Sequence, residues 1–448
     1  MLKLAHTRRQ LFLVVALLSA FTAIARPEAP HVYAITGARI VTAAGAPIAS
    51  GTVLVRGAFI QAVGTPVTVP PEAVVIDGKN LTVYPGLVDM GTAAGLDVPS
   101  IPAPRDPKTR EEVERWKRQV ILRPQIEAAK YVKADAPELH RLAAAGITTI
   151  LAAPPGEVVK GYSSLLNVAA PEDGPQISAV TDERRGLYVV KTPVALHIAL
   201  PSRPASNAYP ASLMGVVAFV RQAFFDAAHD PVERAYYDRT NGTSRPAYDQ
   251  TLDALQPVLT GKLPVAFEVS TARDILRALS LAKEFKLDPI IAGGQEADQI
   301  SADLRATKAR VVFSLAYPER PKTLGPGDDE PLRVLRQRAH VARVPAELDK
   351  AGLLFAFTSG GLKDPKDFVR NAARAVRAGL PAEAAIRALT INAATIAGAG
   401  DRLGSIEKGK IANLIVTDGD LFDEKVKITH VFVDGRPVGI AASPGGSR

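Results

Sequence analysis

The chain has 448 residues, of which 47% are hydrophobic and 22% charged, which supplies apolar surface for a large core and argues against a mainly disordered chain. It contains no cysteine, which excludes a disulfide framework, a Cys-ligated zinc or iron–sulfur centre and a thiol nucleophile. The formal net charge is +8, but the basic residues are scattered rather than clustered, so the composition argues against nucleic-acid binding.

The first 25 residues have the features of an export signal. MLKLAHTRRQ is a short basic start, and the apolar stretch LFLVVALLSAFTAIA ends in small residues at Ala23-Ile24-Ala25. A membrane-spanning helix needs about 20 apolar residues, so an uncleaved anchor is disfavoured. We expect a signal peptide at 1–25 and an exported, periplasmic or extracellular protein that is not an integral membrane protein after cleavage. The pair Arg8-Arg9 leaves open whether export follows the Sec or the twin-arginine route.

Both ends of the mature chain have the pattern of antiparallel strands. From 32 to 84, short β-branched runs alternate with Gly, Pro and Asn turns, and the same pattern returns in ANLIVTDGD and ITHVFVDGRPV. Asp434-Gly435 is typical of a hairpin turn. Each end alone has too few strands to cover its apolar face. We therefore predict one small composite β-sandwich domain built from 26–84 and 405–448.

Between these ends the pattern changes to helices followed by continuous apolar strands. In DAPELHRLAAAGITTILAAP, Asp135 is expected to cap a helix that ends at Gly146, and Thr271 with Asp274 forms a similar capping pair in the next unit. Such alternation predicts an α/β fold with a parallel sheet covered on both faces, and the number of units suggests a (β/α)8 TIM-type barrel over 85–404. The candidate strands lie near 84–89, 147–153, 176–180, 187–190 or 194–200, 264–269, 289–293, 310–315 and 353–358.

A segment near 201–260 interrupts the repeating units. It contains YPASLMGVVAFVRQAFFDAAHD, whose apolar residues run almost all round a helix. We interpret the segment as an insertion that is either a packing helix with a surface excursion, or a lid or partner-binding face beside the barrel mouth.

Two segments carry a family resemblance. YPGLVDMGTAAGL opens the predicted barrel, and ALTINAATIAGAGDRLGSIEKGKIANLIVTDGDLF closes it. Together with the split β-domain, they resemble the amidohydrolase superfamily, near the imidazolonepropionase-like branch, over nearly the whole mature chain. The resemblance implies hydrolysis of C–N bonds other than peptide bonds, such as those of cyclic amides or imides. It also implies zinc or another divalent metal that activates a water molecule.

The resemblance further implies where the metal ligands should lie. The family has histidines two and four positions after Asp89, ligands at the ends of the fifth and sixth strands, and an aspartate ending the eighth. This sequence has at those positions Gly91, Ala93, Glu268, Gly293 and, on the eighth strand, Ser359 or Gly360. Only Glu268 keeps a metal-binding side chain of the usual kind. None of the seven histidines forms a pair with metal-ligand spacing, so we expect no metal at the standard site and no other cofactor.

Several polar residues near the predicted strand ends remain candidates for a site. Each has a structural alternative: an ion pair with a nearby Arg or Lys for Glu268, a helix-dipole contact for Glu296, and a surface salt bridge for Arg221. The candidate catalytic residues are Glu268, Ser359 and Glu296, and the candidate substrate-binding residues are Gln295, Thr358 and Arg221. His197 is the one histidine in a predicted barrel strand, either as a hydrogen-bonded core residue or as a ligand.

These features lead to two functional hypotheses. The first is an exported amidohydrolase-like protein that lacks the standard metal site and binds a small amide, a cyclic imide, a peptide-like ligand or a partner protein without hydrolysis. The alternative is an active hydrolase that cleaves C–N bonds through a non-standard site around Glu268, Glu296 and Ser359, or through a metal supplied differently. The sequence does not indicate an oligomeric state.

Overall fold

The computed structural model describes residues 31–133, 136–168, 189–202, 209–240, 244–325 and 327–439. Apart from His31, these residues belong to one compact unit. The predicted signal peptide and the candidate strand near 176–180 lie outside the described residues. Within the described part, no helix combines the length and the apolar character that crossing a bilayer requires.

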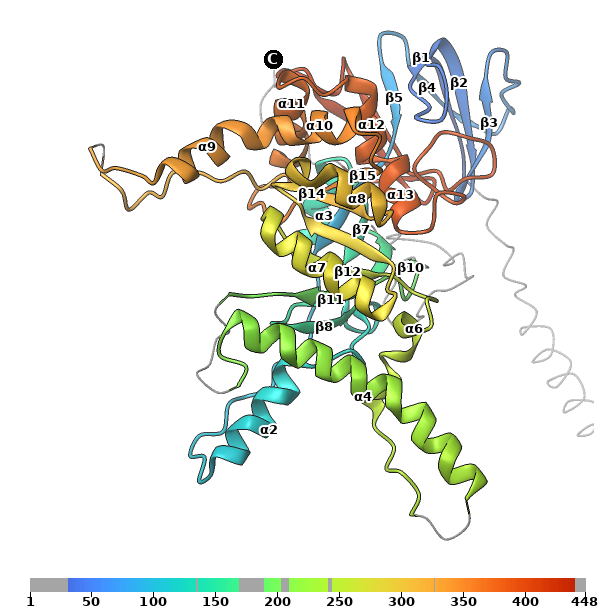
Figure 1. Cartoon of the computed structure of the whole chain (residues 1–448). Coiled ribbons are helices and arrows are strands. Elements are labelled where there is room, and N and C mark those ends of the chain that lie inside the picture. The colour runs from blue at the N-terminus through green and yellow to red at the C-terminus, as the bar shows by residue number, and fades with distance from the viewer. Residues whose placement is uncertain are drawn as a thin grey trace, which may run out of the picture. The chain divides into compact units, whose positions relative to one another are not determined.

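Strands from both ends of the chain form a single sheet. β16 pairs with β5, so that Leu414 faces Pro85 and Thr417 faces Thr82, and the hydrogen-bonded order is β18-β17-β16-β5-β1-β2-β3 with β4 beside β1. The strands are β1 (Val32–Ile40), β2 (Ile48–Arg56), β3 (Phe59–Gly64), β4 (Val74–Asp77), β5 (Thr82–Pro85), β16 (Leu414–Thr417), β17 (Ile428–Val433) and β18 (Arg436–Pro437) (Figure 1).

The described residues of this region form one sheet and not the two stacked sheets of a sandwich. The segment before β16 hydrogen-bonds back to β3, from Ile60 N to Lys410 O at 2.9 Å and from Gly409 N to Ile60 O at 2.8 Å. The sheet therefore curls around its own apolar face, where buried side chains of six strands pack into one cluster. The predicted turn is confirmed, because Asp434 and Gly435 have positive φ between the paired residues Val433 and Arg436.

The central strands form two further sheets, with the orders β10-β9-β7-β6 and β15-β14-β13-β12-β11-β8. β6 and β7 are parallel, as are β11 to β15, whereas β8 and β9 run antiparallel to their neighbours. The fold is thus mixed α/β, and the sheet is not wholly parallel as predicted. The strands are β6 (Leu87–Thr92), β7 (Ile147–Ala152), β8 (Val159–Tyr162), β9 (Ser164–Asn167), β10 (Val189–Lys191), β11 (Leu196–Ala199), β12 (Val265–Val269), β13 (Pro289–Gly293), β14 (Arg310–Ser314) and β15 (Phe355–Thr358).

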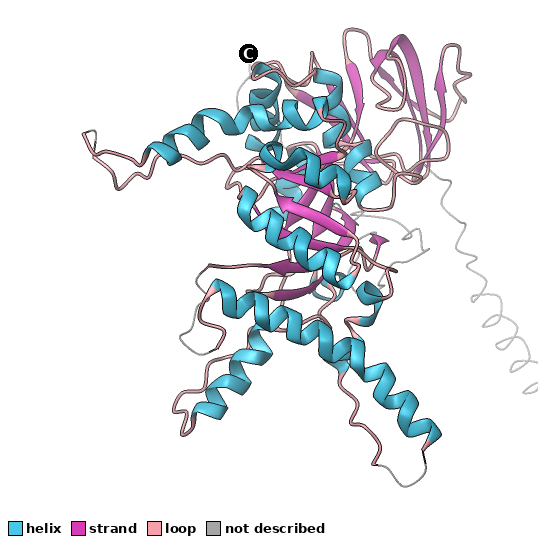
Figure 2. Ribbon diagram, viewed as in Figure 1, coloured by secondary structure: helices cyan, strands magenta, loops and turns pink. Residues whose placement is uncertain are grey.

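Helices connect and cover these strands (Figure 2). The predicted cap of α7 is confirmed, since the Thr271 hydroxyl accepts a hydrogen bond from Asp274 N, while Asp135, the expected cap of α3, lies outside the described residues. The α-helices are α2 (Arg110–Ile121), α3 (Pro137–Ala144), α4 (Leu213–Arg239), α5 (Gln250–Asp253), α6 (Gln256–Leu259), α7 (Ala272–Phe285), α8 (Ser301–Ala306), α9 (Leu332–His340), α10 (Val344–Lys350), α11 (Asp367–Arg377), α12 (Ala382–Leu389) and α13 (Ile391–Ile396). The 3₁₀ helices are η1 (Ala128–Tyr131), η2 (Ala297–Ile300) and η3 (Val341–Arg343).

The two faces of the central strands pack into different cores. One face packs against the helices in the largest cluster, which contains Ile198, Phe267, Ile291, Phe313 and Phe357. The opposite face forms a second cluster, which contains Ala195, Ala266, Ile290, Val312 and Ala356. Because strand side chains alternate between faces, the second face continues at the carboxyl ends of these strands with His197, Glu268, Ala292, Ser314 and Thr358.

Candidate functional site

Three charged or titratable side chains meet at the carboxyl ends of β11 and β12; we call them the site cluster. Glu268 Oε2 accepts a hydrogen bond from Lys160 Nζ at 2.5 Å, and Glu268 Oε1 lies 3.1 Å from His197 Nδ1. The side chains of His197 and Lys160 are 3% and 14% exposed, and that of Glu268 is 30% exposed. The carboxylate is therefore the most accessible member of the cluster, in front of two more deeply buried nitrogen groups.

The strand order explains why these three residues meet. β11 lies between β12 and β8, and because β8 runs antiparallel, its first residues lie beside the carboxyl end of β11. A glycine is required in this strand: Gly161 has φ +117, and a Cβ there would lie 2.5 Å from Ile126 O. The close approach of the chains at Gly161 fixes β8 and thereby places the preceding residue, Lys160, against Glu268.

The neighbours of Glu268 keep it ionised. Burial alone would raise its pKa, but the hydrogen bond and charge of His197, together with Lys160, lower the pKa to about 2. At neutral pH Glu268 is therefore a carboxylate that accepts hydrogen bonds. A group with so low a pKa carries no proton to donate and is a weak base, since general acids and bases work best with a pKa near the working pH.

The site cluster retains unused hydrogen-bonding capacity. An ammonium group has three N–H donors, and within the described residues Lys160 donates only to Glu268. Because a carboxylate only accepts, the proton between His197 and Glu268 belongs to Nδ1, and His197 Nε2 is buried without a partner in the described part of the chain. Lys160 was not among the predicted site residues; a lone lysine inside the apolar run VVKGY is the signal that could have indicated it.

A second buried carboxyl group lies where β6 meets β15. Asp89 is fully buried, its Oδ1 accepts a hydrogen bond from Ser359 N at 2.8 Å, and its Oδ2 has no partner among the described residues. Burial raises the pKa of Asp89 to about 6, although hydrogen bonds from Ser359, Thr358 and Gly91 oppose the shift. Thr358 Oγ1 donates to Gly91 O at 2.8 Å. Thr358 and Ser359 thus join the ends of β6 and β15 and contact Asp89, not Glu268.

The space beside Gly91 is occupied by Thr358. A Cβ on Gly91 would lie 3.0 Å from Thr358 Oγ1, which is closer than nearly all observed contacts of this type. A larger side chain at position 91 therefore requires Thr358 to move. The small residue at position 91 and the hydroxyl at position 358 fit each other.

The other predicted site residues have contacts typical of structural roles. Glu296 Oε2 accepts from Ala272 N at 2.9 Å and so caps α7, while Gln295 Nε2 donates to Ala316 O at 2.9 Å. Arg221 forms a bidentate ion pair with Glu284 at 2.6 to 3.0 Å. Since α7 starts at the carboxyl end of β12 and runs back to the start of β13, Glu284 in its last turn lies at the opposite end of the strands. The structure does not bring Arg221 near Glu268.

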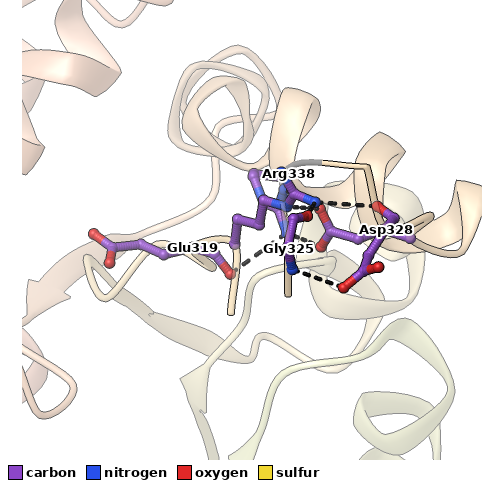
Figure 3. A network of polar contacts seen from close by, with 6 residues as sticks. Glu319, Gly325, Asp328 and Arg338 are labelled. Carbon is purple, nitrogen blue, oxygen red and sulfur yellow. Dashed lines mark hydrogen bonds and ion pairs between the residues drawn. The ribbon is translucent and has the colours of Figure 1, made fainter. Parts of the chain in front are cut away.

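A long excursion follows β14 and is stabilised by its own ion pairs (Figure 3). Arg338 binds both carboxylate oxygens of Glu330, at 3.0 and 2.6 Å, and also Glu319 O at 3.4 Å. The hydrogen bond from Arg338 lowers the pKa of Glu330. Asp328 Oδ2 accepts from Gly325 N at 2.6 Å. These contacts hold the described part of the excursion in a defined conformation.

Comparison with known proteins identifies the family. Residues 297–438 match the amidohydrolase family. An amidohydrolase from Thermotoga maritima MSB8 is similar over 91% of this chain and 99% of its own, with 26% identity and a TM-score of 0.72. Residues 297–438 thus match the amidohydrolase family, and nearly the whole chain is similar in structure to an amidohydrolase.

More distant structures share the fold alone. A prolidase in complex with N-methylphosphonate-L-proline matches 91% of this chain and 99% of its own, with 17% identity and a TM-score of 0.52. Phenylurea hydrolase B matches 92% of this chain and 98% of its own, also with 17% identity and a TM-score of 0.52. None of the curated proteins matches this chain.

The strand ends of this amidohydrolase-family protein do not fit the family's divalent metal. Among the described residues, no group of three or more His, Asp or Glu side chains could hold a metal ion. The carboxylate that remains, Glu268, is bound by the ammonium group of Lys160, which repels a second cation at close range. At the strand-one position, Gly91 has no side chain, and Thr358 fills the adjacent space.

Proposed function

We propose that this chain is an exported amidohydrolase-family protein that binds a small amide or cyclic imide at its strand ends without the metal-dependent hydrolysis of the family. The contact between Lys160 and Glu268 is the observation that carries this proposal. It provides a positive charge and a carboxylate side by side. An ammonium donor next to a carboxylate acceptor matches the C=O and N–H groups of an amide or imide.

We also infer that the central strands close into a barrel with eight positions. In order these are β6, β7, the β9–β8 segment, β11, β12, β13, β14 and β15. Thr358 and Ser359 bridge β15 to β6 through Gly91 O and Asp89, and β9 follows β8 after the single residue Ser163. In such a barrel the carboxyl ends of the parallel strands form the mouth, so the site cluster lies where ligands of this fold bind.

The burial of the site cluster supports binding to a neutral ligand. The charges of Lys160 and Glu268 compensate each other, so this ion pair has no net charge of its own. Glu268 is accessible, and Lys160 has donors left for a ligand oxygen. Charge-assisted hydrogen bonds from such groups are about twice as strong as neutral ones, which suits recognition of a compact polar ligand.

The same geometry gives little support to the alternative, hydrolysis through Glu268, Glu296 and Ser359. Glu268 has a pKa of about 2, which makes it a poor proton donor and a weak base. Glu296 caps α7, and Ser359 contacts Asp89 with its backbone N–H. These residues belong to separate clusters among the described contacts, whereas a nucleophile and its base must be within hydrogen-bond reach.

The decisive experiment measures metal content and ligand binding on the same mature protein. Elemental analysis is expected to find far less than one zinc or manganese per chain. Calorimetric titration with a panel of cyclic imides and short amides is expected to give binding by the wild type that weakens at least about tenfold in Lys160→Met. Lys191→Met is the matched control, because Lys191 contacts Gly398 O and not the site cluster.

Four results would overturn the proposal. The first is near-stoichiometric metal in the wild type. The second is turnover of an amide by the wild type that Glu268→Gln abolishes, which would establish the hydrolase alternative. The third is a panel in which no amide or imide binds. A partner protein that binds the mouth in place of every small molecule would also contradict the proposed ligand class.

A further inference from the structure

α4 has an apolar stripe on its solvent side. Four large apolar side chains on this helix are exposed: Met214 by 84%, Phe225 by 50%, Val232 by 59% and Tyr236 by 56%. Ala218, also exposed, completes the set. Scattered exposed apolar residues are ordinary on a protein surface, but a contiguous row of them marks an interaction site. We call these five residues the α4 stripe.

The spacing of the α4 stripe makes it one continuous row. The intervals from residue 214 to 218, 225, 232 and 236 are 4, 7, 7 and 4 residues. With 3.6 residues per turn, each interval is close to one or two whole turns, so all five side chains lie on the same side of the helix. The row is about 33 Å long at 1.5 Å per residue.

The opposite side of α4 already packs in the core. Val216, Phe219, Val220, Ala223 and Phe224 are buried and lie half a turn away from the α4 stripe. Near the centre of the stripe, the Phe225 ring contacts Phe285 of α7, and Arg221 lies over the Phe225 ring, with its charge paired to Glu284. The core contacts therefore fix the helix with its second apolar face directed to solvent.

We propose that the α4 stripe pairs antiparallel with the α4 stripe of a second copy of this chain, with the twofold axis at Phe225. The intervals 4, 7, 7, 4 read the same in both directions, so a twofold axis at residue 225 places Met214 opposite Tyr236 and Ala218 opposite Val232. A twofold interface requires such self-complementarity, since residue i contacts residue j and j contacts i. The small Ala218 facing Val232 allows the helices to approach closely.

Charge and area are consistent with this partner. Arg221 is the one charged residue close to the axis within the row, and Glu284 of the same chain neutralises it. Half-exposed side chains of this size offer roughly 100 Å² each, or about 400 to 500 Å² per copy. The pair would bury about 1,000 Å² in total, near the lower limit for a specific interface. A dimer with micromolar affinity, dissociating on dilution, is therefore expected.

Sedimentation measurements on the mature protein across micromolar concentrations test the pairing. The wild type is expected to be a concentration-dependent dimer, and Phe225→Glu is expected to weaken dimerisation at least about tenfold, because it places two like charges at the axis. The matched control is Leu335→Glu on α9, which replaces another apolar side chain of similar exposure, 43%, and is expected to leave the dimer unchanged.

Cysteine cross-linking tests the register, because the chain contains no cysteine of its own. Helices that pack 8–10 Å apart bring facing Cα atoms within disulfide reach. Phe225→Cys is therefore expected to form a disulfide-linked dimer on mild oxidation. Met214→Cys is expected not to do so, because its two copies would lie about 33 Å apart, whereas Met214→Cys combined with Tyr236→Cys restores cross-linking.

The results of these experiments distinguish a second copy of the chain from other partners of the α4 stripe. A wild type that stays monomeric throughout the micromolar range overturns the proposal, and so does a monomer whose stripe binds lipid vesicles instead. Equal cross-linking of Phe225→Cys and Met214→Cys overturns the antiparallel register. A dimer that persists in Phe225→Glu with unchanged affinity shows that another surface forms it. None of these results depends on whether a ligand binds at the strand ends.

Discussion

Two buried polar clusters in this chain differ in how completely their polar groups are hydrogen-bonded to one another. The site cluster contains an ion pair and opens to solvent at Glu268. The second cluster, which we call the junction cluster, consists of Thr149, Asn167, Asn413 and Asp434. It joins β7 and β9 to the chain just before β16 and to the turn between β17 and β18.

The junction cluster is closely paired. Asn413 Nδ2 donates to both Thr149 Oγ1 at 3.0 Å and Asn167 Oδ1 at 2.9 Å, while Asn413 Oδ1 accepts from Asp434 N at 2.8 Å. Asn167 Nδ2 donates to Asp434 Oδ1 at 2.6 Å, and Thr149 Oγ1 donates to Asn167 Oδ1 at 2.8 Å. Amide groups can both donate and accept, so four side chains satisfy one another with no full charge except at Asp434.

This difference indicates that the junction cluster stabilises the fold and that the site cluster is suited to ligand binding. A closed network of hydrogen-bonded groups fixes one arrangement of the chain, because any broken member leaves a buried group unpaired. The site cluster instead leaves donors on Lys160 and the exposed part of Glu268 without partners among the residues that the structure describes. Unpaired polar groups near a surface are available to a ligand, and this is the physical basis for placing function at the strand ends and structure at the junction.

Removing the C-terminal side of the junction cluster should have the largest effect on folding and solubility. A chain that ends at Gly404 loses β16, β17 and β18 together with Asn413 and Asp434, which exposes the edge of β5 and the apolar face of the curled sheet. We expect such a chain to be insoluble. Soluble yield and circular dichroism of the truncated protein test this, and a stable, folded product would show that the junction is dispensable.

Breaking the ion pair of the site cluster should have the next largest effect. Glu268→Gln leaves Lys160 largely buried without its counter-charge, which we expect to lower the free energy of unfolding by about 2–3 kcal/mol. That range lies below the usual value for a fully buried pair, since Glu268 retains contact with water. Urea unfolding measures the change.

A double variant provides the control for this ion pair. Lys160→Met combined with Glu268→Gln removes both charges and keeps the side-chain volumes, so most of the lost stability should return. If the double variant loses as much unfolding free energy as the two single variants together, Lys160 and Glu268 are not coupled. The site cluster would then contain no ion pair in solution.

The sequence predicted the central fold wherever the apolar pattern was continuous. The expected strands near 147–153, 264–269, 289–293 and 310–315 coincide with β7, β12, β13 and β14. β8 and β9 were missed because VVKGYSSLLN is short and contains Gly161 and two serines, which have low strand propensity. The curled sheet was also not predicted, because curvature depends on contacts between the chain ends and not on local periodicity.

The sequence predicted the site only in part, because one residue of the site cluster lies on a strand that was not predicted. Glu268 was a candidate, and an ion pair with a lysine or arginine was its structural alternative, but the partner could not be named. Lys160 lies 108 positions away on a strand that the pattern did not reveal. His197 was expected either as a hydrogen-bonded core residue or as a ligand, and the structure gives it the first role, beside Glu268.

The stability of the junction cluster should depend on pH through Asp434 in a range where Glu268 stays ionised. Burial raises the pKa of Asp434 from 3.8 to about 7, although Asn167 and the charge of Arg436 oppose the shift. The folded chain therefore binds more protons than the unfolded chain between about pH 4 and 7, so this group's contribution to stability falls as pH rises through that window. Glu268, with its pKa lowered, changes its contribution only below about pH 4.

Asp434→Asn tests this assignment. Asparagine tolerates the positive φ at this position and can still accept the hydrogen bond from Asn167, but it does not titrate. The variant should be more stable than the wild type by about 1–2 kcal/mol at pH 7 and above, and the difference should vanish near pH 4. Parallel urea unfolding from pH 4 to 8 measures it. A difference that is constant across this range would mean that Asp434 does not titrate in the folded chain. Asp89, whose pKa is about 6, is common to both proteins and cancels.

The smallest effect is expected from the ion pair between Arg221 and Glu284. The pair has bidentate geometry like the strongest surface pairs, but its side chains are 48% and 31% exposed. Water therefore screens the two charges, and it can hydrogen-bond Glu284 when Arg221 is removed. Arg221→Ala should therefore change the free energy of unfolding by less than about 1 kcal/mol, and it should leave ligand binding unchanged, because α7 places Glu284 at the end of the strands opposite Glu268. Urea unfolding and the imide titration test both statements. A loss as large as that in Glu268→Gln would show that burial is not what distinguishes the two ion pairs.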